Sequence, residues 1–300
     1  MFNDTTIEYS GMRKFIDKYI DFLQAKLDIK IDFQITRPKD NQTFISVNRK
    51  IGIPLISKQT AKSVSFVKRM MKKYNVSYET IMQHSEPTIE NVEILKSLFG
   101  GLKSIPLYIL GYTSSINKFD SEYRIAKKWL PLINAPFEIS DKCCEILKHG
   151  NIPAKFKDYA MMTAEMAEES RSRLASYLQT GCNDALKHGG NKSKPMGPMT
   201  LQTVLRNIKE NNIPLFSGYG EIVEENGIYR TTGMYRTGCA LCGFGLDFIP
   251  NRFVELYKTE PARVKFAFKP RSEGGLGYKE ALEYCNKYCG TSFGIPDIED

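Results

Sequence analysis

The feature that most constrains the fold is a helical pattern followed directly by a strand pattern near the N-terminus. Residues 12–27 place their apolar side chains on one helical face, and in residues 29–35 apolar and polar residues then alternate. Met1–Asp4 predicts the end of an earlier strand. Two parallel strands need a long crossover connection, so strand, helix and strand together predict an α/β fold with a parallel sheet and flanking helices.

The remaining patterns predict an α/β domain over residues 1–215 and an irregular, cysteine-containing C-terminal lobe over residues 216–300. A helical insertion is expected within the first domain, at residues 60–132, broken at Gly100-Gly101 and at Ile105-Pro106. Further helices are expected at residues 43–51, 59–74, 141–149, 168–178, 201–211 and 278–287, with a short strand at 159–163.

The charge of the chain favours an anionic partner. Its 300 residues carry a net charge of +8, which fits a nucleotide, a sulfated metabolite or nucleic acid. A solvated basic surface is the simpler reading of the net charge alone. No apolar run approaches the ~20 residues of a membrane span. The N-terminus also lacks a signal-peptide pattern, so the sequence predicts a cytoplasmic protein.

Two cysteine pairs are the most informative motifs: Cys143-Cys144, and Cys239 with Cys242 in a glycine-flanked Cys-x-x-Cys. A Cys-x-x-Cys supplies two thiolates to one centre, and a four-thiolate site would need the adjacent pair as well. Adjacent cysteines on a helix point about 100° apart, which suits an iron–sulfur cluster better than one small zinc ion. Zinc at these cysteines, and buried idle thiols, remain as alternatives.

The other cysteines are less specific. Cys182 is compatible with a further ligand, a core filler or a reactive thiol, and it is the candidate catalytic nucleophile. Cys285 and Cys289 share one face of the last expected helix. They are compatible with a metal or redox pair, although a half-buried helix edge is the simpler reading.

Several segments along the chain resemble, in order, the phosphoadenylyl-sulfate reductase-like sulfurtransferases, especially their phage and bacterial branch. The segments are Phe2-Asn3-Asp4-Thr5 with Ile7-Glu8-Tyr9, Arg37-Pro38, Gly52-Ile53-Pro54, Ala135-Pro136-Phe137 with Lys142-Cys143-Cys144, Glu169-Ser170-Arg171-x-Arg173 with Gly181-Cys182-Asn183, Thr200 with Ile208–Pro214, Tyr219-Gly220, and Arg236-Thr237-Gly238-Cys239-x-x-Cys242 with Asn251-Arg252-Phe253.

The resemblance implies a five-stranded parallel sheet of the adenine nucleotide alpha-hydrolase-like type, binding of ATP or a sulfonucleotide, and sulfur chemistry. It implies a [4Fe–4S] cluster held by Cys143, Cys144, Cys239 and Cys242. Asp4 and Thr5 are expected at the carboxyl edge of the sheet, where such folds bind ligands. Arg171, Arg173 and Arg236 are candidate ligands of a sulfate or phosphate group, with ordinary surface positions as the alternative.

Two motifs of this family have no counterpart here. One is the opening strand with its Ser-Gly-Gly-x-Asp-Ser phosphate loop, and the other is the C-terminal Glu-Cys-Gly-x-His tail. The sequence therefore also allows a non-catalytic nucleotide-binding module, or half of a split enzyme whose missing strand and loop come from a partner polypeptide. A third possibility is a sulfurtransferase that modifies nucleic acid.

Overall fold

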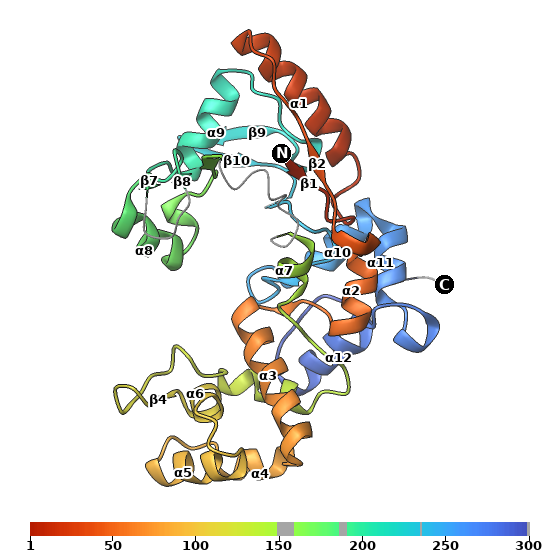
Figure 1. Ribbon diagram of the computed structural model, residues 1–300. Helices are drawn as coiled ribbons and strands as arrows, with labels where there is room; N and C mark the ends of the chain where they lie inside the picture. The colour runs from red at the N-terminus through yellow and green to blue at the C-terminus, as the bar shows by residue number, and fades with distance from the viewer. Residues whose placement is uncertain (149–158, 186–190, 235, 299–300) are drawn as a thin grey trace. The chain divides into compact units, whose positions relative to one another are not determined.

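The computed structural model describes residues 1–148, 159–185, 191–234 and 236–298. Within them the fold is mixed α/β and mostly helical, with small sheets of two or three strands (Figure 1). Contacts divide the chain into two compact units that alternate along the sequence. Unit 1 comprises Met1–Asp4, Glu8–Thr36 and Asn151–Gly238, and unit 2 comprises Thr5–Ile7, Arg37–Gly150 and Cys239–Asp300.

This division differs from the boundary expected at residue 215. The chain passes between the units after Asp4, after Ile7, after Thr36 and after Gly238, as well as in the segment around residue 150. No proline- or glycine-rich linker marks the first three crossings. Composition therefore could not reveal a division that depends on which segments contact each other.

Unit 1 carries the predicted strand–helix–strand pattern. Its elements are β1 (Phe2–Asn3), α1 (Met12–Leu27), β2 (Ile35–Thr36), β6 (Met161–Met162), α8 (Arg171–Thr180), β7 (Asn183–Ala185), β8 (Asn191–Ser193), α9 (Leu201–Glu210), β9 (Ile222–Glu225) and β10 (Ile228–Thr231). β1 and β2 pair in parallel, with Phe2 opposite Ile35, and α1 connects them. The parallel pairing predicted from the sequence is confirmed.

The strand expected over residues 29–35 is much shorter in the structure. Only Ile35–Thr36 belongs to a strand, and Ile29 is exposed. Strand pairing needs neighbouring backbone to complete its hydrogen bonds, and an alternating sequence does not supply that neighbour. Among the described residues each parallel pairing between strands is a short ladder of two residue pairs, and no extended parallel sheet is present.

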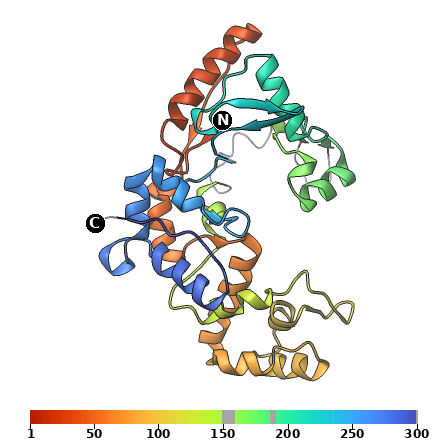
Figure 2. The same ribbon diagram turned by 180° about the vertical axis from the view of Figure 1, so that it is seen from behind.

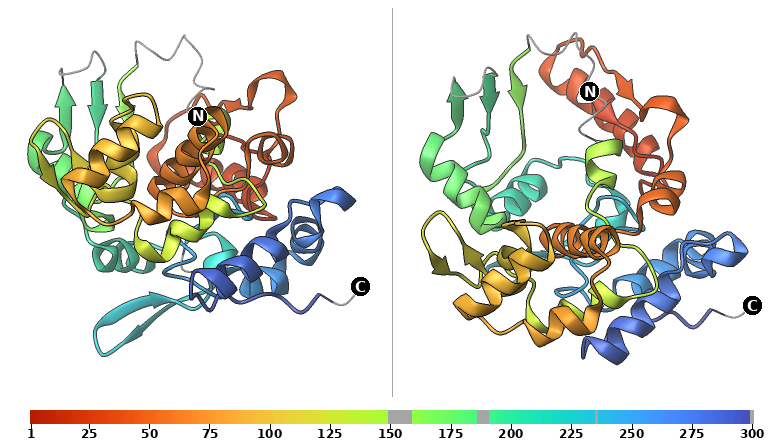
Figure 3. Two further views of the ribbon diagram at one scale, coloured as in Figure 1. Left: turned by 90° about the horizontal axis from the view of Figure 1, so that it is seen from below. Right: turned by 60° about the horizontal axis from the view of Figure 1, so that its bottom comes forward.

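Unit 2 contains most of the helices. Its elements are α2 (Phe44–Ile51), β3 (Leu55–Ile56), α3 (Lys58–Tyr74), α4 (Tyr78–Gln83), α5 (Ile89–Leu98), α6 (Ser104–Leu110), β4 (Tyr112–Thr113), β5 (Lys118–Phe119), a 3-10 segment (Lys127–Asn134), α7 (Cys143–Leu147), β11 (Gly243–Phe244), α10 (Arg252–Thr259), α11 (Pro261–Phe268) and α12 (Tyr278–Tyr288). Figures 2 and 3 show these elements from behind, from below and tilted.

The expected helical insertion is only partly helical. Ile105-Pro106 was expected to interrupt it, but both residues lie in the first turn of α6, where proline is tolerated because its missing N–H has no partner in the helix. Residues 112–119 form the β4–β5 hairpin, with Tyr112 opposite Phe119. The helix expected at 141–149 is α7, and residue 149 lies outside the described residues.

No helix among the described residues has both the length and the apolar character that crossing a membrane would require.

Candidate metal centre

The Cys239–Cys242 turn is held by backbone pairing to β3. β11 follows Cys242 directly and pairs in parallel with β3, Gly243 opposite Leu55. A Cβ atom on Gly243 would lie 2.5 Å from the carbonyl oxygen of Pro54, so only glycine allows this approach. At the other end of the turn, the Ala240 N–H donates to the Ile7 carbonyl over 2.8 Å. The turn is thus attached to two other segments of unit 2.

The segment that precedes Cys143 pairs with the same strand. Ile139 forms a parallel bridge with Ile53, which donates to the Glu138 carbonyl and accepts from the Ser140 N–H, each over 3.0 Å. The Ile56 carbonyl instead accepts from Gly245 over 2.7 Å. Successive backbone groups of a strand point to opposite edges, so residues 53–56 bond one cysteine segment along each edge.

Ile56 shows that this strand is held in an unusual conformation. Its φ is +67°, a value that a β-branched residue rarely adopts, and its side chain is buried. The next residue, Ser57, caps α3 by accepting from the Thr60 N–H over 3.1 Å. The strand between the two cysteine segments is therefore followed directly by a capped helix.

The thiols of the two pairs influence one another's pKa values. The pKa of the Cys143 thiol is raised by its hydrogen bond with Cys144, then by burial, and then by the charges of Cys144, Cys242 and Cys239. Burial raises the pKa of Cys242 to about 11, and Cys239 and Cys144 contribute in the same direction. The structure therefore brings the two predicted pairs into one group within unit 2, which we call the four-cysteine group.

Polar groups of unit 2 approach the sulfur atoms of this group. The Phe244 N–H hydrogen-bonds the Cys242 thiol and lowers its pKa, as does the charge of Arg252. The Thr5 hydroxyl lies 3.4 Å from the Cys239 sulfur, and Arg252 donates to the Cys239 carbonyl over 3.3 Å. Such contacts stabilise thiolate and influence the potential of a cluster bound by it.

The donor set of the four-cysteine group fits a cationic centre. Burial and mutual repulsion disfavour thiolates here, and a bound cation would reverse that balance. Within the described ranges no group of three or more His, Cys, Asp or Glu side chains is gathered so as to hold a metal ion. Zinc draws its sulfur ligands to about 2.3 Å, so the four described thiols are not arranged as a closed zinc site.

The predicted nucleotide ligands lie, with one exception, in unit 1. Asp4 continues the β1–β2 ladder by donating its N–H to Thr36 over 2.9 Å. Arg171 and Arg173 are both exposed in the first turn of α8, and Arg173 is paired with Glu169. A 3-10 segment, Ala167–Glu169, directly precedes α8.

Arg236 is exposed in unit 1, next to Thr237, whose side chain hydrogen-bonds the Tyr219 hydroxyl over 2.8 Å. Cys182 is half-buried in unit 1, near Tyr177, whose pKa is raised by burial and then by this thiol. Thr5 belongs to unit 2, where it is buried beside Cys239. The described contacts therefore place Thr5 with the four-cysteine group and the other candidates in unit 1.

The sequence did not reveal the residues that support the four-cysteine group. Tyr278 is fully buried and donates its hydroxyl to the Leu241 carbonyl over 2.6 Å, between the two cysteines of the turn. Lys68 is buried in α3 and donates to the carbonyls of Ala135 and Phe137 over 2.8 and 2.6 Å. Each is one aromatic or basic residue on a helix, and only long-range contacts give it this role.

Replacing Lys68 by methionine is expected to lower the free energy of unfolding by about 2–3 kcal/mol, because two buried carbonyls lose a charged donor. Lys72→Met, one turn further on, is the matched control. Lys72 is 74% exposed and pairs with Glu138, so its loss should cost less than about 1 kcal/mol. Urea unfolding followed by the fluorescence of Trp129, the single tryptophan, measures both. If the two substitutions lower the free energy of unfolding equally, the hydrogen bonds of Lys68 to Ala135 and Phe137 do not stabilise the protein as argued.

Comparison of the chain with protein-family models, with curated proteins and with solved structures gives no match.

Proposed function

We propose that the four-cysteine group holds a [4Fe–4S] cluster, and that the protein handles ATP or a sulfonucleotide in a sulfur-transfer step. The observation that carries the proposal is that residues 53–56 bond the segments of Cys143-Cys144 and of Cys239–Cys242 on opposite edges. If the cysteines were buried thiols without a ligand, there would be no reason for two motifs far apart in the chain to pair with the same strand. A bound cluster would supply iron atoms within unit 2 that can polarise a bound substrate and transfer electrons.

The chain's own residues prepare this site for thiolate ligands. The Phe244 N–H and the Thr5 hydroxyl are hydrogen-bonding groups beside Cys242 and Cys239. Arg252 contributes positive charge, and burial of Cys143 keeps water from that sulfur. These features favour a resident centre over a transient ligand.

The nucleotide part of the proposal rests on the family resemblance and on chemistry. Arg171, Arg173 and Arg236 are exposed guanidinium groups of unit 1, and guanidinium binds phosphate and sulfate in a bidentate manner. Asp4 is proposed near the nucleotide and Cys182 as the nucleophile. The cytoplasmic location belongs to the same proposal.

Anaerobic purification with iron, sulfide and zinc analysis tests the cluster. We expect a brown protein with about four irons per chain. Cys143→Ser and Cys239→Ser should each lose most of the iron and the visible absorption. Cys182→Ser, in unit 1, should keep both. Stoichiometric zinc, or a colourless protein free of metal, would contradict the proposal.

Isothermal titration with ATP and with adenylyl sulfate separates an enzyme from the alternatives. Binding that weakens in Arg171→Ala/Arg173→Ala supports the proposed role of these arginines. Binding without turnover favours a non-catalytic module. Absence of binding, restored by a separate polypeptide that carries a phosphate loop, favours a split enzyme.

A further inference from the structure

The outward face of α3 carries a row of cations. Its members are Lys58, Lys62, Arg69, Lys72 and Lys73, all exposed, and we call them the basic stripe. At about 100° per residue they fall within an arc of roughly 100°, and along the axis they span about 22 Å. The opposite face of α3, with Val64 and Val67, is buried in unit 2.

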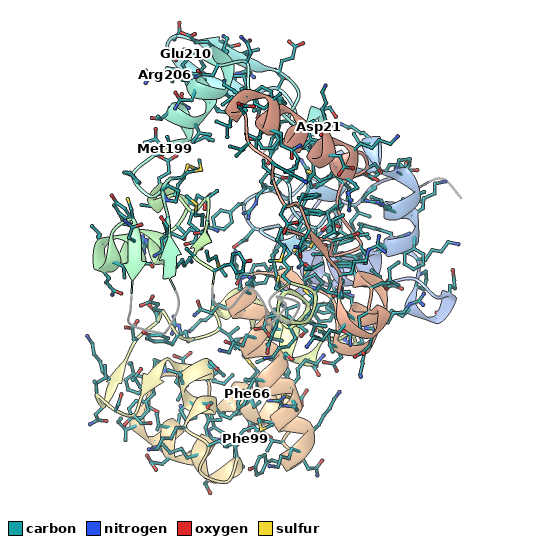
Figure 4. The ribbon with its side chains drawn as sticks, turned by 45° about the horizontal axis from the view of Figure 1, so that its top comes forward. Asp21, Phe66, Phe99, Met199, Arg206 and Glu210 are labelled. Atoms are coloured by element: carbon teal, nitrogen blue, oxygen red, sulfur yellow. The ribbon has the colours of Figure 1, made fainter. Side chains whose placement is uncertain are left out.

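Little carboxylate charge balances this row. Lys72 pairs with Glu138, which also lies 3.6 Å from the buried Lys68. In the part of the chain that the structure describes, Lys58, Lys62, Arg69 and Lys73 have no ion pair with a carboxylate. Arg69 lies over the Phe66 ring at 5.5 Å and Lys73 over the Tyr74 ring at 5.2 Å, contacts that orient a cation without neutralising it (Phe66 is labelled in Figure 4).

The length of the basic stripe selects the kind of anion. Like charges on neighbouring helix turns repel and destabilise the helix, so a partner with repeated negative charge would relieve repulsion along the whole row. A nucleotide or sulfate would engage only one or two of these cations. Each strand of a DNA duplex carries a phosphate about every 3.4 Å of helix axis, so a row about 22 Å long can face several phosphates at once.

A membrane surface fits the basic stripe less well. Helices that bind membranes place apolar side chains beside the basic ones, so that these enter the lipid. Most apolar side chains of α3, including Ala61, Val64 and Met70, are instead buried in the protein, and Phe66 and Met71 are half-buried. Little apolar surface is left to enter a lipid layer, whereas binding to a phosphate backbone requires only charge.

We propose that the basic stripe of α3 binds the phosphodiester backbone of a nucleic acid without reading its bases. The inference goes beyond the proposed function and does not depend on whether a metal centre forms. It also gives the stripe a place relative to the four-cysteine group. Lys68 and Lys72 fasten α3 to residues 135–138, the segment that leads to Cys143, so a bound strand would pass beside that segment.

Fluorescence anisotropy of the full chain with labelled 20-nucleotide strands tests this. Single-stranded DNA, RNA and duplex DNA of mixed sequence are titrated at several salt concentrations. We expect binding whose logarithm falls linearly with the logarithm of salt. Lys58→Ala/Lys62→Ala should weaken it and reduce the magnitude of that slope by roughly 1–2. The strand type that binds best identifies the nucleic acid.

Lys14→Ala/Lys18→Ala is the matched control, because it removes two exposed lysines, also four residues apart, from α1 of unit 1. It should bind like the unmodified chain. Far-ultraviolet circular dichroism of the whole chain, with Trp129 fluorescence for unit 2, establishes that both variants are folded, and metal analysis of the same samples reports on the four-cysteine group separately. Three results would overturn the inference: no binding at low salt, equal weakening by both pairs of substitutions, or tighter binding to phosphatidylserine vesicles than to any nucleic acid.

Discussion

Replacing Tyr278 by alanine is expected to lower the free energy of unfolding of unit 2 by about 3–5 kcal/mol. The side chain is fully buried and packs against Phe253 and Phe268, with ring centroids 5.0 and 6.0 Å away. Its hydroxyl also donates to the Leu241 carbonyl within the cysteine turn, and burial raises its pKa well above the ordinary value. Alanine removes both the ring and the hydrogen bond, so the turn loses its support.

Tyr278→Phe separates the two contributions. It keeps the ring and leaves the Leu241 carbonyl without this donor, so a loss of about 1–3 kcal/mol is expected. Tyr288→Ala in the same helix is the control, since Tyr288 is 51% exposed and should cost no more than about 1 kcal/mol. Urea unfolding followed by Trp129, which is buried in unit 2, measures all three. If alanine at 278 costs no more than phenylalanine, the packing argument is wrong.

Gly52→Ala is expected to destabilise unit 2 by about 3 kcal/mol or more and to deplete the metal bound by the four-cysteine group. Gly52 has a φ of +101° and a ψ of 162°, a region essentially restricted to glycine. A Cβ atom there would lie 2.5 Å from the carbonyl oxygen of Glu138 and 2.9 Å from the nitrogen of Ile139. Those backbone atoms belong to the pairing that positions Cys143.

Gly101→Ala is the matched control for this substitution. Gly101 also has a positive φ, +82°, but an added Cβ would meet nothing within 4 Å. Only the backbone strain of about 1–2 kcal/mol should appear, with the metal content unchanged. Urea unfolding and iron analysis compare the two variants. Equal stability losses, or full iron content in Gly52→Ala, would contradict the importance of the close approach at Glu138.

Most of the helices could be predicted because their signals are local. The helix expected at 12–27 is α1, and the ones expected at 59–74 and 201–211 are α3 and α9, each within a residue. The starts of α3 and α9 follow from capping chemistry, since Ser57 and Thr200 each accept from the N–H three residues later. Side-chain spacing and capping operate within a few residues and so are visible in the sequence.

The sheet could not be predicted in the same way. Alternation at 29–35 indicated a long strand, but only Ile35–Thr36 found a partner. The β4–β5 hairpin formed where a helical stretch was expected, since pairing across a turn outweighed local preference. Strand length depends on the neighbours that complete the backbone hydrogen bonds, and these neighbours are distant in the sequence.

The sequence by itself identified the candidate residues: an adjacent cysteine pair, a Cys-x-x-Cys between glycines, and basic residues in the segment that forms α3. Only the tertiary structure decided that the two pairs belong to one group, because residues 53–56 hydrogen-bond Glu138 and Ser140 on one edge and Gly243–Gly245 on the other. It also assigned Arg171, Arg173 and Arg236 to unit 1 and the four-cysteine group to unit 2. A motif is recognised from residues that are neighbours in the sequence. Whether two motifs lie close together in the fold depends on backbone pairing between segments that no local pattern links.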